Sequence, residues 1–283
     1  MTEQTIRVPA SLGREEYVEV EKNVKLHVTD LGEGKPVVLI HGWPLSDAMF
    51  EYQYAALLDR GYRTIGITLR GFGLSDKPGG TYNYDVFADD IKVVLEKLNI
   101  ENATIGGFSM GGATVLHYVA KYNAAHVSRL ALFGAAAPMW TRHDDFNYGH
   151  WTRADVNGLI ELNNTNRPQL LETFGKIFPA NETSVSAGHG AWLGNIQAQA
   201  SPYAMAECLK DLRDGDLRED LKKITVPTLI LHGRVDKICS YELAEQMHTL
   251  VPDSKLVPFE MSGHALFIEE REKFNDELLK FIA

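Results

Sequence analysis

The sequence predicts an α/β protein with a mostly parallel sheet of eight strands, flanked by helices, and a helical cap inserted between two of the strands. Two observations lead to this fold class. Short apolar segments rich in β-branched residues alternate with segments of helical periodicity, which is the pattern of a parallel sheet covered by helices. Residues 138–220 interrupt that alternation, because they contain helical fragments but no clear strand.

The predicted strands begin with a hairpin and continue as buried runs. Residues 17–30 alternate with period two around a turn near Asn23, which predicts two antiparallel strands. Residues 36–41 form a continuous β-branched run, as expected of a strand buried on both faces. The same pattern recurs in the remaining predicted strands, which are residues 62–68, 103–108, 129–134, 228–232 and 255–260.

Between the strands, apolar residues recur at helical spacing. Ile91, Val94 and Leu95 belong to one such segment, with acidic residues opposite, and Phe274 and Leu278 belong to another near the carboxyl end. We expect both helices to lie on the faces of the sheet.

The predicted cap, residues 138–220, divides the core domain into residues 1–137 and 221–283. Such a cap covers a pocket at the carboxyl ends of the strands, where ligands bind in open α/β sheets. We expect two or three of its aromatic side chains to face the pocket and the others to form the cap's own core. The aromatic residues of this segment include Trp140, Phe146, Tyr148, Trp151, Phe174, Phe178 and Trp192.

Composition narrows the classes of function. Lysine and arginine number 28 against 38 acidic residues, so the net charge is −10, and no dense basic run occurs, which argues against nucleic acid and anionic membranes as partners. Cys208 and Cys239 lie far apart in the chain with no neighbouring cluster of zinc-ligand spacing, so we expect neither a disulfide nor a metal. The amino terminus lacks the pattern of a signal peptide and no apolar run has transmembrane length, which leads us to expect a cytoplasmic protein.

The most informative motif is G-x-S-x-G at residues 107–111, with Ser109 at its centre. It falls where a predicted strand ends and a helical segment begins, the context that the motif requires. Glycines on either side allow the tight turn that holds the serine out for nucleophilic attack.

A serine hydroxyl needs a base to remove its proton, and usually a carboxylate to orient that base. Asp236 follows one predicted strand and His264 follows the last, so the chain order Ser109, Asp236, His264 is that expected for this fold. His232 and His248 are rival bases, but the first closes a strand and the second lies in a helical stretch. Asp236 could instead be a turn-forming aspartate, although no other acid occupies its loop.

The oxyanion that forms during acyl transfer needs two backbone donors. Met110 begins the helix after the serine, and Trp43 follows Gly42 in the loop after residues 36–41, so their N–H groups are the predicted donors. His41 is expected to hydrogen bond within its loop. We expect the pocket walls to include Trp43, Pro44, Trp140 and Ile238.

Taken together, these residues give the chain a resemblance to the α/β-hydrolase superfamily, and within it to the cofactor-free haloperoxidase, perhydrolase and aryl esterase group. The matching segments run over nearly the whole chain and are HGWPLSDAMFEYQ, LRGFGLSDKP, YDVFADDIKVVLEKL, GGFSMGG, VPTLILHGRVDKI and SGHALFIEE. The resemblance implies the α/β-hydrolase fold, a triad of Ser109, Asp236 and His264, and no cofactor. It also implies perhydrolysis, in which hydrogen peroxide replaces water as the second nucleophile, an activity associated in this family with a proline at the position of Pro44.

The chain departs from the family's pattern at three places. Thr68 and Leu69 stand where Asp-Arg is common, Cys239 and Ser240 replace an apolar-proline pair, and Ala113 replaces a third glycine. None of these changes removes a catalytic group. Cys239 either lines the pocket or is a buried, inert thiol.

The predicted function is therefore that of a serine carboxylesterase for small, short-acyl esters, with perhydrolysis as a secondary activity. One alternative is a carbon–carbon bond hydrolase or lactonase, for which Arg142, His143 or Arg153 would bind a substrate carboxylate. A second alternative is a ligand-binding receptor on a hydrolase scaffold. The sequence leaves the oligomeric state open, a homo-oligomer included.

Overall fold

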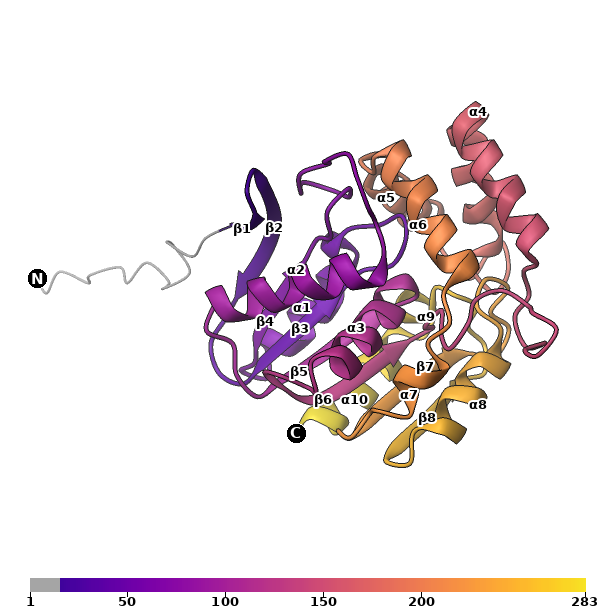
Figure 1. Ribbon diagram of the computed structural model, residues 1–283. Coiled ribbons are helices and arrows are strands. Elements are labelled where there is room, and N and C mark those ends of the chain that lie inside the picture. Colours follow the sequence, from indigo (N-terminus) through magenta and orange to yellow (C-terminus); the bar gives the residue numbers. More distant parts are fainter. Residues whose placement is uncertain (1–15) are drawn as a thin grey trace, which may run out of the picture.

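The computed structural model describes residues 16–283 and contains one sheet of eight strands in the order β1-β2-β4-β3-β5-β6-β7-β8 (Figure 1). The first two strands form the predicted hairpin, β2 pairs antiparallel with β4, and every later pairing is parallel. The strands are β1 (Tyr17–Glu21), β2 (Val24–Leu31), β3 (Pro36–Ile40), β4 (Arg63–Ile67), β5 (Ala103–Phe108), β6 (Val127–Phe133), β7 (Thr228–Gly233) and β8 (Ser254–Phe259). The predicted fold class is confirmed.

The centre of the sheet is fully buried because it is covered on both faces. Every residue of β5 and of β7 is buried, whereas β2 alternates between buried and more exposed positions as a strand with one open face does. Strand β3 lies between β4 and β5, so the segments that follow β3 and β5 leave the sheet beside each other.

Helices cover the two faces of the sheet. Helix α1 (Glu51–Leu58) packs against α10 (Arg271–Ile282), while α3 (Met110–Lys121) packs against α2 (Tyr84–Lys97) and α7 (Arg218–Leu221). The remaining helices of the core are the short η1 (Asp47–Phe50), α8 (Tyr241–Leu250) and α9 (Leu266–Glu269). The two helices predicted from periodicity are α2 and α10.

Three long helices lie between β6 and β7 in the chain, within the predicted cap at residues 138–220, and we call this segment the insertion. They are α4 (Arg153–Ile177), α5 (Ala187–Ala198) and α6 (Pro202–Asp214), and Figure 1 shows them grouped beyond one end of the sheet. Helix α4 bends at Asn166, whose backbone is not helical, two residues before Pro168.

Indole groups attach this insertion to the core. The Trp43 indole donates a hydrogen bond of 3.2 Å to the Met205 carbonyl on α6. The indoles of Trp140 and Trp151 each donate one of 2.9 Å to the Ile238 carbonyl in the loop after β7. These bonds place the helices of the insertion over the loops that follow β3 and β7.

Two expectations include residues that the structure does not describe. The predicted core begins at residue 1 and the signal-peptide analysis concerns the amino terminus, so both include residues 1–15, which lie outside the described part. Between residues 16 and 283 no helix combines the length and hydrophobicity needed to cross a bilayer.

Candidate active site

Ser109 lies at the sharp turn between β5 and α3, where it is the residue immediately before the helix. Its backbone has φ 54° and ψ −119°, which is an uncommon conformation for a residue with a side chain. Gly107 makes the turn possible, since a Cβ atom there would lie 2.2 Å from the Gly111 carbonyl oxygen. The turn therefore holds Ser109 in one orientation at the carboxyl edge of the sheet.

Backbone hydrogen bonds hold this strained turn in place. The Ser109 N–H donates to the Phe133 carbonyl at 2.9 Å, and the Ser109 carbonyl accepts from Ala136 at 3.0 Å and from Ala113 at 3.2 Å. Because two of these partners follow β6 or end it, the neighbouring strand supports the conformation of the serine.

Asp236 and His264 lie in the loops after β7 and β8 and are joined by a hydrogen bond of 2.6 Å between Asp236 Oδ2 and His264 Nδ1. The second oxygen of the carboxylate accepts from the N–H groups of Ile238 and Cys239 at 2.8 and 2.9 Å. Burial acts to raise the pKa of Asp236, but the attraction and hydrogen bond of His264 outweigh it and hold the pKa below the ordinary value. The carboxylate is thus kept charged beside the imidazole.

The other nitrogen of the His264 ring is free for chemistry. His264 Nε2 is buried and has no hydrogen-bond partner within residues 16–283. The rings of Phe108 and Phe178 pack against the imidazole, with centroids 4.6 and 5.5 Å from its own. His264 and Ser109 line the same cavity.

The two rival histidines have different surroundings. His232 is fully buried, with its Nε2 2.9 Å from the Cys239 carbonyl and 3.6 Å from Asp236 Oδ2, and burial lowers its pKa. His248 is on α8, where its Nδ1 lies 2.8 Å from Ser254 Oγ. Neither lines the cavity that contains Ser109.

The loop after β3 comes into direct contact with Ser109. A Cβ atom at Gly42 would lie 2.9 Å from Ser109 Cβ, so only glycine allows this approach. The His41 ring bonds to the Gly42 carbonyl in its own loop and accepts a second hydrogen bond from the Leu69 N–H in the segment after β4. The backbone N–H groups of Trp43 and Met110 donate no hydrogen bond to any residue that the structure describes. Two unpaired donors therefore lie beside the serine turn.

The cavity above Ser109 is small and mostly apolar. Its volume is about 20 Å³, roughly the space that one water molecule occupies. The four predicted wall residues, Trp43, Pro44, Trp140 and Ile238, all line it. Five further lining residues were not predicted, and these are Ala136, Phe174, Phe178, Gln197 and Leu212.

Most of the unpredicted wall comes from the insertion. Phe174 and Phe178 lie at the end of α4, Gln197 on α5 and Leu212 on α6. The aromatic residues of the insertion that face the cavity are thus Trp140, Phe174 and Phe178, in agreement with the expected number. Helical periodicity identifies these aromatic residues only as apolar. Which of them line the cavity depends on how the helices of the insertion pack against the core.

Cys239 is a buried thiol next to the site. Burial and the Asp236 carboxylate raise the pKa of this thiol well above its ordinary value, although interactions with the Ser109 and Trp140 side chains act in the opposite direction. The thiol therefore stays protonated and does not compete with the serine as a nucleophile.

The polar residues that would suit a substrate carboxylate do not line this cavity. Arg153 forms an ion pair of 2.5 Å with Asp214, and Arg142 donates to the His150 carbonyl at 3.3 Å, while His143 bonds to a neighbouring threonine. The described residues contain no group of three or more His, Cys, Asp or Glu side chains placed to hold a metal ion.

The departure at Thr68 has a physical explanation in the fold. The Thr68 hydroxyl donates a hydrogen bond to the buried carboxylate of Asp47, which also accepts one of 2.6 Å from Thr29. An aspartate at position 68 would bring a second carboxylate against Asp47, and buried like charges repel each other strongly.

Comparison with known proteins identifies relatives over almost the full length. The family described as alpha/beta hydrolase fold matches residues 35–271. The AB hydrolase superfamily protein YisY of Bacillus subtilis is 44% identical over 94% of this chain and 98% of its own. The bifunctional esterase/perhydrolase DCH of Acinetobacter calcoaceticus is 29% identical over 94% of this chain and 99% of its own.

Two solved structures have nearly the same fold. An esterase from Exiguobacterium antarcticum superposes with a TM-score of 0.92 at 43% identity, covering 95% of this chain and 99% of its own. A bromoperoxidase from Bacillus anthracis superposes with a TM-score of 0.91 at 34% identity, covering 94% and 98%.

Proposed function

This chain belongs to the alpha/beta hydrolase fold family and is close to its esterases and non-heme haloperoxidases, and on that premise we propose that it is a serine carboxylesterase acting on small, short-acyl esters. One observation carries the proposal. His264, oriented by Asp236, presents an unbonded Nε2 in the small cavity that it shares with Ser109. This is the arrangement needed to activate a serine hydroxyl.

In the proposed mechanism Ser109 Oγ attacks the ester carbonyl carbon while its proton passes to His264 Nε2. The N–H groups of Trp43 and Met110 bind the oxyanion, and the loss of one such donor generally costs about a hundred-fold to a thousand-fold in rate. The bond to the alcohol then breaks, and the proton on His264 goes to the departing oxygen. Asp236 stabilises the imidazolium throughout.

The acyl-enzyme is released by a second nucleophile. Water adds to the acyl carbon and gives its proton to His264, the bond to Ser109 Oγ breaks, and that oxygen takes the proton back. Hydrogen peroxide can replace water in the same step, in which case the product is a peracid. The similarity to an esterase/perhydrolase supports this secondary activity, as does the presence of Pro44 in the cavity wall.

The proposed substrates follow from the size of the cavity. A volume of about 20 Å³ beside Ser109 is too small for a long acyl chain, which limits the proposed acyl group to acetyl or a similarly short one. Residues of the insertion form part of the wall, so the proposed division into a core and a cap at residues 138–220 assigns part of the acyl selection to the cap.

The test is the initial rate of p-nitrophenyl acetate hydrolysis by the wild type, by Ser109→Ala and by the control Ser128→Ala, whose hydroxyl bonds to a backbone carbonyl far from the site. We expect the rate of Ser109→Ala to fall by roughly a thousand-fold or more and that of the control to stay near wild type. Equal rates in Ser109→Ala and the wild type, or no hydrolysis of short-acyl esters by the wild type, would contradict the proposal.

A further inference from the structure

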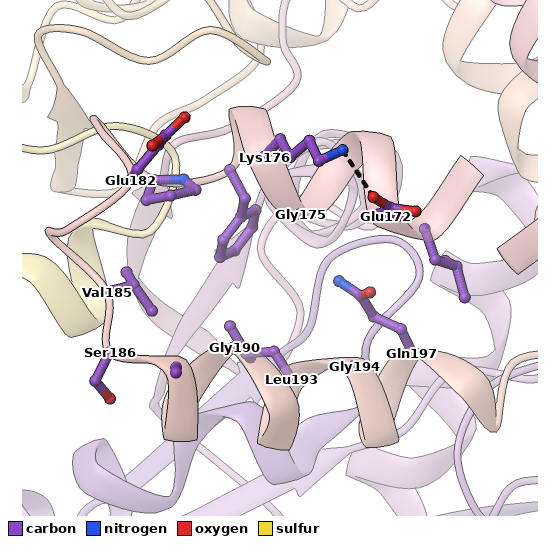
Figure 2. Close-up of a pocket in the computed structure, with 14 residues that line it drawn as sticks. Glu172, Gly175, Lys176, Glu182, Val185, Ser186, Gly190, Leu193, Gly194 and Gln197 are labelled. Carbon is purple, nitrogen blue, oxygen red and sulfur yellow. Dashed lines mark hydrogen bonds and ion pairs between the residues drawn. The ribbon is translucent and has the colours of Figure 1, made fainter. Parts of the chain in front are cut away.

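A second and much larger cavity lies between α4 and α5 (Figure 2). Its volume is about 630 Å³, within the usual range for small-molecule sites. Apolar side chains make up much of its wall, including Leu171, Val185 and Leu193, and the Lys176–Glu172 ion pair of 2.7 Å lies on the α4 side. We call this space the outer cavity and the space above Ser109 the inner cavity.

The two cavities are neighbours, because Phe178 and Gln197 line both of them. Gln197 is only 7% exposed, and its carboxamide, in the wall of both cavities, has no hydrogen-bond partner among the described residues. Figure 2 shows the side chain extending from α5 toward α4, into the space between the helices. The carboxamide is not among the fully buried polar atoms that lack a partner, so it is accessible from the cavity, where a bound molecule can replace water as its hydrogen-bond partner.

The position of Phe178 indicates which part of an ester enters the outer cavity. The ring of Phe178 packs edge-on against His264, with centroids 5.5 Å apart. In the proposed reaction His264 must protonate the departing alcohol, so the alcohol lies on the His264 side of the carbonyl carbon. The outer cavity therefore lies next to the alcohol side of the site, and the inner cavity is left for the acyl group.

We propose that the outer cavity binds the alcohol part of the substrate and that Gln197 hydrogen bonds to a polar atom of that alcohol. This inference rests on the proposed esterase function and refines it. The preferred substrates are esters of a short acid with a large, mainly apolar alcohol that carries a hydrogen-bonding group near the ester. A large alcohol and a small acyl group are thus selected by different cavities.

Glycines in the wall of the outer cavity provide the means of testing it. A Cβ atom at Gly175, Gly190 or Gly194 would meet nothing within 4 Å, so a larger side chain there would extend into the cavity without displacing its neighbours. Gly158 is a matched control, because it is also a helical glycine with open space around it, but it does not line either cavity. Replacement of any of these helical glycines also improves helix propensity.

The first experiment uses two isomeric esters, hexyl acetate and methyl heptanoate, with methyl acetate as the reference. For the wild type we expect kcat/KM to be at least about tenfold higher for hexyl acetate than for methyl heptanoate. In Gly194→Leu we expect the ratio of kcat/KM for hexyl acetate to that for methyl acetate to fall about tenfold, while in Gly158→Leu the ratio stays as in the wild type. A tenfold change corresponds to about 1.4 kcal/mol of transition-state binding.

Three results would overturn the inference. The first is a wild-type preference for methyl heptanoate over hexyl acetate. The second is an unchanged ratio of kcat/KM for hexyl acetate to that for methyl acetate in Gly194→Leu. The third is a selective loss of methyl heptanoate hydrolysis in that variant, which would place the acyl group in the outer cavity. Urea unfolding checks that the variants are folded, and Gly175→Leu fills the same cavity from α4 if Gly194→Leu does not fold. Retention of hydrolysis by Ser109→Ala would instead refute the esterase mechanism. Failure of the esterase proposal can therefore be distinguished from failure of the proposal that the outer cavity binds the alcohol.

The second experiment tests Gln197 with 2-methoxyethyl acetate and butyl acetate, which have the same number of heavy atoms and differ by one ether oxygen. In Gln197→Met, an unbranched apolar replacement, we expect kcat/KM for the ether-containing ester to fall about tenfold relative to butyl acetate. An equal change for both esters would assign Gln197 a role in packing and remove it from the proposal.

Discussion

Nδ1 of His264 lies 2.6 Å from Oδ2 of Asp236, while Nε2 of the same ring is buried without a partner among the described residues. The carboxylate thus determines which nitrogen of the imidazole carries the proton. Nε2 lies on the opposite side of the ring from the carboxylate, where it has no partner in the described part of the chain.

Replacement of Asp236 by asparagine is expected to reduce kcat for p-nitrophenyl acetate by about a thousand-fold to ten-thousand-fold. An amide keeps the size of the side chain but cannot stabilise the imidazolium, and it favours the wrong tautomer. Asp253→Asn, at an exposed position, is the control. A loss of less than tenfold in Asp236→Asn would contradict the proposed role of Asp236.

The substitution Gly107→Ala is expected to lower the free energy of unfolding by about 2 kcal/mol or more, because its Cβ atom would lie 2.2 Å from the Gly111 carbonyl oxygen. Urea denaturation measures this change. Gly79→Ala is the matched control, since a Cβ atom there would meet nothing within 4 Å, and it should change stability by no more than about 0.5 kcal/mol. Equal stabilities of the two variants would show that the turn tolerates a side chain.

For Pro44→Leu we expect a lower ratio of peracid formation to ester hydrolysis. Pro44 lines the inner cavity directly after Trp43, and its ring fixes the backbone φ at that position. Leucine removes this restriction and changes the wall against which the second nucleophile must fit. The measurement is the ratio of peracid to free acid formed from the acyl-enzyme in the presence of hydrogen peroxide. An unchanged ratio in Pro44→Leu would show that perhydrolysis does not depend on Pro44.

A buried polar cluster around Asp47 predicts a pH-dependent contribution to stability. Burial acts to raise the pKa of Asp47, but the attraction of His27, 3.5 Å away, and hydrogen bonds from Thr29 and Thr68 outweigh it and lower the pKa from 3.8. The contribution of Asp47 is therefore present above pH 3.8 and is lost as the pH falls through the lowered pKa of the folded state. Interaction with Asp47 raises the pKa of His27, so its contribution is present below pH 6.5 and is lost as the pH rises through the raised value.

The stability difference between the wild type and Asp47→Asn should accordingly be greatest between pH 3.8 and pH 6.5. We expect the variant to be less stable there by about 1–3 kcal/mol. Urea unfolding across this pH range, with Asp253→Asn as the control, measures the difference. A difference that does not vary with pH would mean that the cluster contributes through packing alone.

Local patterns in the sequence were sufficient for the fold and for the positions of the three proposed catalytic residues. Ser109 could be identified because the glycines around it permit only a tight turn, and Asp236 and His264 because they follow strands of one parallel sheet. The carboxyl ends of parallel strands lie at one edge of the sheet, so residues far apart in sequence were expected to meet there.

The inner wall made by Phe174, Phe178, Gln197 and Leu212 was decided only by the tertiary structure. These residues lie on three helices of the insertion, and helical periodicity does not distinguish a side chain that faces another helix from one that faces the cavity. Their positions depend on contacts between the insertion and the core, such as the bond from Trp43 to Met205. The sequence by itself thus determined the proposed reactive groups through local turn geometry and strand order, whereas long-range packing of the inserted helices decided the shape of the space in which those groups would act.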